Sequence, residues 1–184
     1  ASARTTRRWR ARAWRCRTGE LIDSAAALLP DQLVGSRAVV FPSGDGHLRC
    51  LRCADGSAIW SLDARESQQA GFNNWFEGNV AVGYDGTLYA GNTNFSYYAI
   101  SPAGRLKWTY ATGANAWSNA AFGNDGTIYW ASNDTMIRAV RPDGVEKWRR
   151  RTLGMLAASA AVGSDGTIYI GSFDSYLRAL DPTT

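Results

Sequence analysis

Long hydrophobic runs are missing from this chain of 184 residues. A membrane-spanning helix needs about 18 or more consecutive apolar residues, and no stretch of the chain approaches that length. We therefore expect no transmembrane segment. The sequence also lacks the apolar core of a signal peptide, a segment that is cleaved from mature exported proteins.

Cysteine and histidine are scarce, with three cysteines and one histidine. Cys50 and Cys53 form a single Cys-x-x-Cys pair, and Cys16 stands apart. A structural zinc site needs four ligands, but the sequence offers no second pair and only His47 nearby. We expect no metal site, treat the paired cysteines as small buried hydrophobic side chains, and expect His47 at the surface. The oxidation state of the three cysteines stays open.

Uninterrupted helical windows are also missing, because Gly or Pro breaks each window before three turns accumulate. The chain instead repeats Asp-Gly-Thr-Leu/Ile-Tyr at residues 85–89, 125–129 and 165–169, at intervals of 40 residues. Repetition at about this period indicates an architecture in which each unit buries its faces against its neighbours.

Each repeat has the composition of four short strands. Asp-Gly and Asn-Asp dipeptides separate short runs rich in Ile, Tyr, Val and Trp, as in β-hairpins. Four antiparallel strands per period of this length form one blade of a β-propeller. A more divergent copy precedes the other three. We predict an all-β propeller of four four-stranded blades within residues 20–184, at about 24–66, 75–113, 115–152 and 155–184.

Glycine and tryptophan recur together at the ends of the units. The pairs are Gly56 and Trp60, Gly104 and Trp108, and Gly144 and Trp148. A buried Trp contributes at most about 4–6 kcal/mol of transfer free energy. We expect each indole to hold its blade against the next one, and each Gly to allow a tight turn.

Three segments, Gly163–Ser172, Tyr176–Pro182 and Gly144–Trp148, together resemble the pyrroloquinoline-quinone (PQQ) repeat family. Cys50–Trp60 is similar to the docking motif of that family. The resemblance covers residues from about 24 to 184 and implies a quinoprotein alcohol dehydrogenase-like propeller, usually of eight blades. It also implies a periplasmic or extracellular location.

The resemblance does not by itself imply catalysis, because many members of the family bind no quinone and serve as scaffolds. In the dehydrogenases, PQQ lies between a Trp and a disulfide of adjacent cysteines, beside a calcium ion. This chain has no adjacent cysteines and no matching set of calcium ligands. We predict no cofactor and no catalytic residue, with a PQQ- and calcium-dependent dehydrogenase, or a fragment of one, as the alternative.

Propellers bind partners through the loops at one face of the ring, and long loops in repeat proteins are often functional. Trp side chains beside Asn and Glu suit stacking and hydrogen bonding to a protein, a peptide or a glycan. The alternative is that the indoles only plug the mouth of the ring. The candidate contact residues are Trp75, Phe76, Glu77, Asn94, Trp117, Asn119 and Asn133.

The two ends of the chain suggest how the ring is completed. Residues 13–23 also fit the docking pattern, with Asp23 where Trp should stand, and the last copy stops before its fourth strand. Either four blades close within one chain, or two chains exchange ends to make an eight-bladed homodimer, which we favour. A third possibility is a fragment of a longer propeller.

Basic residues are concentrated at one end of the chain. Seven of the 20 Lys and Arg residues lie within residues 1–19, whereas the remainder has 13 basic and 16 acidic residues, a net charge of −3. This Arg-rich segment, which has room for a closing strand, is either a disordered leader or a contact for nucleic acid or anionic lipid. Trp9 and Trp14 favour the contact slightly, since indoles stack on bases.

Overall fold

The strands of this protein form four antiparallel sheets that follow one another along the chain. A computed structural model describes residues 14–64 and 74–183. Within each sheet the strands are hydrogen-bonded in sequence order, as in the blades of a propeller. We number the sheets as blades 1 to 4.

The strand bounds are as follows. Blade 1 contains β1 (Ala27–Leu29), β2 (Ala38–Pro42), β3 (His47–Arg52) and β4 (Ala58–Asp63), and blade 2 contains β5 (Ala81–Val82), β6 (Leu88–Asn92), β7 (Ser96–Ile100) and β8 (Leu106–Ala111). Blade 3 contains β9 (Ala121–Phe122), β10 (Ile128–Ala131), β11 (Met136–Val140) and β12 (Glu146–Arg151), and blade 4 contains β13 (Ala161–Val162), β14 (Ile168–Gly171) and β15 (Leu177–Leu180).

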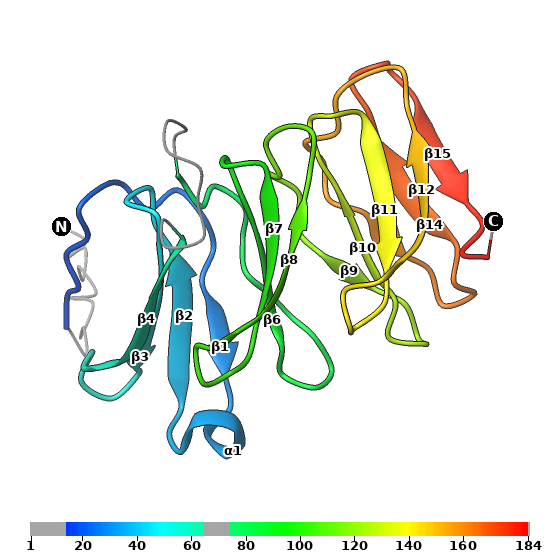
Figure 1. The fold of residues 1–184 in the computed structure, drawn as a ribbon. Coiled ribbons are helices and arrows are strands. Elements are labelled where there is room, and N and C mark those ends of the chain that lie inside the picture. The colour runs from blue at the N-terminus through cyan, green and yellow to red at the C-terminus, as the bar shows by residue number, and fades with distance from the viewer. Residues whose placement is uncertain (1–13, 65–73, 184) are drawn as a thin grey trace, which may run out of the picture.

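The blades stand side by side in an open arc, with the described N-terminal segment at one end and β15 at the other (Figure 1). The prediction of four strands in every blade needs correction for blade 4, which has three strands among the described residues, because that copy stops before its fourth strand. The four sheets do not close into a ring within the described residues, so the alternative of a closed four-bladed ring is not confirmed. In the described part of the chain, no helix is long and apolar enough to cross a membrane.

The interfaces between blades contain the hydrophobic core. Central strands such as β6 and β10 are buried along their whole length because a neighbouring blade covers each face. Between blades 2 and 3, the rings of Tyr97 and Trp130 stack with centroids 4.5 Å apart. Between blades 3 and 4, Ile137 packs with Ile168 and Ile170.

Each outer-strand Trp spans two blades. The indole of Trp60 in blade 1 lies on the β7–β8 turn of blade 2, and its Nε1 donates a hydrogen bond of 2.8 Å to the carbonyl of Pro102. A Cβ atom added to Gly104 would lie 2.6 Å from Cγ of Trp60. Trp108 and Trp148 donate in the same way to Pro142 and Pro182, at 2.9 and 2.8 Å.

Trp14 completes this series at the N-terminal end. Its Nε1 donates to the carbonyl of Cys53 at 3.0 Å, and a Cβ atom on Gly56 would lie 2.5 Å from its ring. Trp14 therefore contacts blade 1 as Trp60 contacts blade 2. The alignment that put Asp23 in the Trp position was wrong. Of the Arg-rich segment, residues 1–13 lie outside the described residues.

We predict that Gly104→Ala lowers the free energy of unfolding by about 3 kcal/mol, because the new methyl group both collides with Trp60 and requires a left-handed backbone. Gly104 has φ = +78°. Gly35→Ala is the matched control, since Gly35 has φ = +74° but no heavy atom within 4 Å of an added Cβ. Urea denaturation of both variants measures the difference. If the two variants lost the same free energy of unfolding, the contact between Gly104 and the indole would contribute little to stability.

Candidate functional site: the loop face

One end of every blade combines a hairpin loop with the segment that enters the blade. The β2–β3, β6–β7, β10–β11 and β14–β15 loops lie at this end, together with residues 74–80, 112–120 and 152–160 that connect successive blades. We call this end the loop face. Its geometry is set by a polar cluster under each hairpin loop.

Blade 3 shows the cluster most clearly. The guanidinium of Arg138 forms an ion pair with Asp134, and its Nη1 also donates to the hydroxyl of Ser132 at 2.9 Å. Asp134 additionally accepts a hydrogen bond of 2.8 Å from the backbone N–H of Gly113 in the preceding connector. Both charged side chains are almost buried, with 5% and 11% exposed. The cluster thus fixes the loop to the connector.

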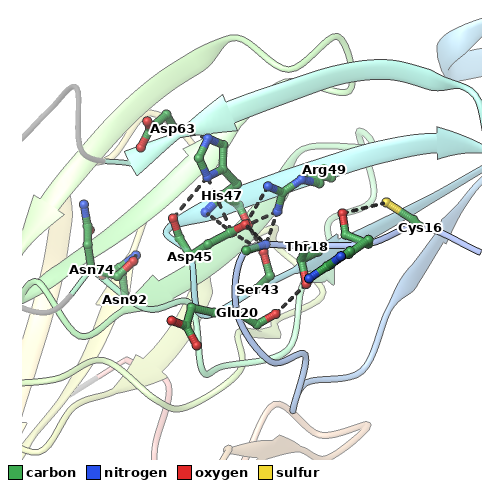
Figure 2. A network of polar contacts seen from close by, with 12 residues as sticks. Cys16, Thr18, Glu20, Ser43, Asp45, His47, Arg49, Asp63, Asn74 and Asn92 are labelled. Carbon is green, nitrogen blue, oxygen red and sulfur yellow. Dashed lines mark hydrogen bonds and ion pairs between the residues drawn. The ribbon is translucent and has the colours of Figure 1, made fainter.

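Blades 1 and 4 repeat this arrangement. In blade 1, Asp45 pairs with Arg49 at 2.7 Å, as Figure 2 shows. Asp45 also accepts a hydrogen bond from the backbone N–H of Gly19 at 2.9 Å. In blade 4, Asp174 pairs with Arg178 at 2.7 Å and accepts from Leu153 at 2.9 Å. These residues belong to a pattern, Ser-x-Asp-x-x-x-Arg, that the sequence analysis missed although it is visible at residues 43–49, 132–138 and 172–178.

The charged partners determine the ionisation of these carboxyl groups. Burial alone would raise the pKa of Asp134, but the hydrogen bonds from Arg138, Ser132 and Gly113 lower it from 3.8 to about 2. The pKa of Asp45 is lowered by the equivalent bonds against the same effect of burial. The carboxylates therefore stay ionised and paired throughout the neutral range.

Blade 2 replaces the ion pair with neutral groups. Asn94 stands in the Asp position and donates 2.7 Å and 2.6 Å hydrogen bonds to the hydroxyl of Tyr98 and the side chain of Asn74. Asn94 is buried, with 7% exposed. Its amide therefore links the connector to the loop, and Asn94 offers little surface to a partner.

The hairpin loops are also held in an unusual backbone conformation. Phe95, Thr135 and Ser175 adopt positive φ angles of 64°, 72° and 69°. The backbone N–H of Thr112 donates to the carbonyl of Phe95 at 2.7 Å, and that of Thr152 donates to Thr135 at 2.8 Å. Left-handed non-glycine residues persist only where neighbouring contacts hold them. The loop face is therefore rigid before any partner arrives.

Trp75 is the most exposed of the predicted contact residues, with 39% of its surface accessible. Two hydrogen bonds to Thr93 hold its backbone. The N–H of Trp75 donates to Oγ1 of Thr93, and its carbonyl accepts from the Thr93 N–H, both at 2.9 Å. Phe76, by contrast, is fully buried against Tyr98. It supports the loop face from below and does not reach its surface.

Glu77 and Trp117 lie half-buried on adjoining connectors. A Cβ atom on Gly78 would lie 3.0 Å from the carbonyl oxygen of Trp117, which shows how closely the two connectors approach. Burial, together with the negative charge of Asp23, raises the pKa of Glu77. The indole nitrogen of Trp117 is buried and has no hydrogen-bond partner among the described residues.

The two remaining candidates differ in their roles. Asn119 accepts from the N–H of Asn79 at 2.9 Å, and its own N–H donates to Oγ of Ser159 at 2.9 Å, so it connects three blades. Asn133 is half-buried, but its side-chain oxygen is itself buried and has no hydrogen-bond partner among the described residues. Asn119 is thus engaged in the fold, and the side-chain oxygen of Asn133 is not exposed to a ligand.

His47 and the cysteines have structural surroundings. His47 is only 22% exposed, and its ring nitrogens lie 3.4 Å and 3.6 Å from carboxylate oxygens of Asp45 and Asp63 (Figure 2). The nearby Ser43 hydroxyl donates to Asp45 and to a backbone carbonyl, and no hydrogen bond joins it to the imidazole. Within residues 14–64 and 74–183, no group of three or more His, Cys, Asp or Glu residues could hold a metal ion.

Cys50 behaves as a buried hydrophobic side chain. It is fully buried in β3, and all three cysteines of the chain are free thiols. Burial, with a contribution from Cys53, raises the pKa of the Cys50 thiol to about 11. A thiol with this pKa is almost entirely protonated at neutral pH and is a poor nucleophile.

A family profile described as outer membrane protein assembly factor BamB matches residues 44–184. The chain belongs to this PQQ-like repeat family. No curated protein matches the chain. The profile match over the repeats therefore shows the family.

Solved structures confirm the propeller fold. BamB from Moraxella catarrhalis is 20% identical, with a TM-score of 0.69 over 89% of this chain and 48% of its own. The WD40 β-propeller domain of Doa1 is 16% identical, with a TM-score of 0.66 over 84% and 49%. A Bacteroides caccae protein of unknown function is 15% identical, with a TM-score of 0.60 over 91% and 59%. The chain thus spans about half the length of these proteins.

We predict that Asp134→Asn lowers the free energy of unfolding at pH 7 by about 2 kcal/mol. The folded pKa of Asp134, about 2, lies below the ordinary value of 3.8. The ionised carboxylate therefore makes its full contribution to the free energy of unfolding well above pH 4, and that contribution disappears as the pH falls through about 2. Denaturant titrations of both proteins across this range should show the two stabilities converging.

Asp143→Asn is the control for that measurement. Asp143 also pairs with an arginine, at 3.3 Å, but its side chain is 59% exposed. Exposed pairs contribute little, so this variant should be nearly as stable as the parent at every pH. A stability gap for Asp134→Asn that persists below pH 2 would show that the loss is not caused by the charge.

Proposed function

We propose that the chain is a non-catalytic scaffold module whose loop face binds a protein segment, a peptide or a glycan. The observation that carries the proposal is Trp75, an exposed indole whose backbone is pinned to Thr93 from both sides. A rigid aromatic side chain gives a large contact area at a small cost in conformational entropy. Glu77, which is half-buried two residues farther along the same connector, supplies a carboxyl group.

The family is consistent with this role. Its description names an outer membrane protein assembly factor. We accordingly propose that the chain works in the periplasm or outside the cell. The ion-paired loops support the proposal because a preorganised surface loses little entropy on binding.

Trp75→Ala tests the role of the loop face. On peptide and glycan arrays probed with the intact chain, we expect the variant to lose at least about tenfold in affinity for the recognised class, with an unchanged Tm. Leu106→Ala is the control, since Leu106 is 45% exposed at the opposite end of blade 2. Equal binding by Trp75→Ala and the parent would contradict the proposal.

We further propose that a second copy of the chain completes the ring. The far face of blade 4 presents residues that the other blades bury. Tyr169 is 42% exposed, whereas Tyr89 and Tyr129 are buried, and Leu177 is 76% exposed, whereas Ile137 is fully buried. The next blade covers this face in blades 1 to 3, whereas in blade 4 the same face is exposed. An exposed apolar face of this kind favours an eight-bladed homodimer.

Leu177→Lys tests this assembly. One chain has a mass of 20.0 kDa, so we expect light scattering to give about twice that value for the parent and a single-chain mass for the variant. Leu106→Lys is the control, because Leu106 is 45% exposed on the outer strand of blade 2, away from both ends of the arc. A parent that stays at the single-chain mass at all concentrations would rule the dimer out.

We also propose that the module works without a quinone. The vicinal disulfide that packs on PQQ in related dehydrogenases cannot form here, because Cys50 and Cys53 are separated by two residues and Cys50 is buried within β3. Titration of PQQ with calcium, followed by quinone absorbance, should show no saturable binding. Tight binding at one equivalent per chain would favour the dehydrogenase alternative.

A further inference from the structure

The end of the blades opposite the loop face contains an open apolar groove between blades 2 and 3. We call this end the turn face; it carries the β5–β6 and β9–β10 turns and the turns that each outer-strand Trp covers. The groove has a volume of about 220 Å³. Its lining includes the rings of Tyr84, Tyr89 and Phe122, together with Ile128 and Pro142.

The equivalent position between blades 1 and 2 is filled by the chain itself. Helix α1 (Asp31–Val34) lies in the long β1–β2 turn, at the lower edge of blade 1 in Figure 1. A Cβ atom on Gly86 would lie 2.6 Å from Cδ1 of Leu33 and 3.2 Å from Cγ of Pro102. The leucine side chain therefore rests on the Asp-Gly turn and the proline of blade 2.

The groove between blades 2 and 3 has the equivalent Asp-Gly turn and proline, but no leucine lies on them. Gly126 and Pro142 correspond to Gly86 and Pro102 at the 40-residue spacing. A Cβ atom on Gly126 would meet only Pro142, at 3.7 Å. The short β5–β6 turn of blade 2 carries no helix, so no side chain of the described chain occupies the place that Leu33 takes in the neighbouring groove.

The walls of the open groove are more aromatic than those of its neighbours. Tyr84, which is 77% exposed, packs against Phe122 with centroids 6.0 Å apart, and buried Tyr89 lies 5.6 Å from Phe122. The corresponding groove between blades 3 and 4 has more polar residues in its lining, among them Asp125 and Lys147. Among the described residues, the groove between blades 2 and 3 is thus the one that combines three aromatic rings with a missing leucine.

The charges at the rim are already compensated. Asp85 pairs with Lys107 at 3.3 Å, and Arg141 pairs with Asp143 at 3.3 Å beside Pro142. A charged ligand would gain little binding free energy from side chains that are already paired with each other. Apolar contact therefore dominates what this groove recognises.

We propose that the groove between blades 2 and 3 binds a leucine or isoleucine side chain presented on a short turn of a partner protein, as Leu33 is presented within this chain. The inference goes beyond the proposed function, since it concerns the opposite face of the blades. Leu33 on the turn of Gly86 and Pro102 is the internal example of the complex. The partner segment supplies the helical turn that blade 2 lacks.

A cyclic peptide of residues 30–37 is a direct probe. Leu29 and Ala38 are paired neighbours in the sheet, so the segment between them can be closed head to tail. In titrations of the isotope-labelled chain followed by amide NMR shifts, we expect saturable changes at Gly83–Asp85, Phe122 and Gly126. A dissociation constant of about 1 mM is reasonable for one anchored side chain.

Three variants give the expected pattern. Tyr84→Ala should weaken binding about tenfold, because it removes an exposed wall without disturbing the core. Trp75→Ala should have no effect, which separates this groove from the loop face. Leu33→Ala vacates the first groove, so the peptide should then also shift the amides of Gly86 and Ser101. A cyclic peptide with Leu33→Asp should bind to neither groove.

Several results would overturn the proposal. These are the absence of saturable shifts up to about 10 mM, unchanged affinity in Tyr84→Ala, and shifts confined to the loop face. Binding of hexanol at the same amides without binding of the peptide would instead identify the groove as a site for small apolar molecules. That outcome also rejects a protein partner.

Discussion

The contact of an indole with the glycine turn of the next blade is the interaction on which the rest of this structure depends. Trp60, Trp108 and Trp148 each donate a hydrogen bond to a carbonyl of the neighbouring turn. The indoles of Trp60 and Trp108 also lie where a Cβ atom on Gly104 or Gly144 would otherwise stand. The contact needs a left-handed glycine, as at Gly104, and a Trp at a fixed distance along the chain. It joins separate sheets into one arc, because an isolated four-stranded sheet leaves both apolar faces exposed.

The two ends of the blades use this common frame differently. At the loop face, buried Asp–Arg pairs and left-handed residues such as Thr135 hold the hairpins against the connectors. At the turn face, the polar clusters are more exposed, as in the pairing of Asp85 with Lys107, and the indoles cover the turns between the outer strands. The loop face is thus suited to presenting fixed side chains, whereas the turn face leaves grooves between blades, one of which the chain fills with Leu33.

Much of the fold could be predicted, but less of the candidate site. The 40-residue spacing was enough for the strands and the family, and the end of the last copy indicated the missing fourth strand of blade 4. The spacing left open whether four blades close into a ring. The prediction that Phe76 lies at the surface was wrong because it rested on the neighbouring Trp75 and Glu77. The positions 40 and 80 residues later are the apolar Ala116 and Leu156, which are fully buried, and this spacing could have indicated that Phe76 is buried too.

The sequence by itself determined the repeat, the strand order and the family, because turn residues and alternating side chains act locally and recur at one period. Only the tertiary structure decided which side chains remain available. Tyr89, Tyr129 and Tyr169 occupy the same place in three repeats, yet Tyr169 alone is exposed, since exposure depends on whether another blade follows. Likewise, Leu33 lies in a groove and Tyr84 at the rim of an open one because neighbouring blades bring together turns that lie far apart in the chain.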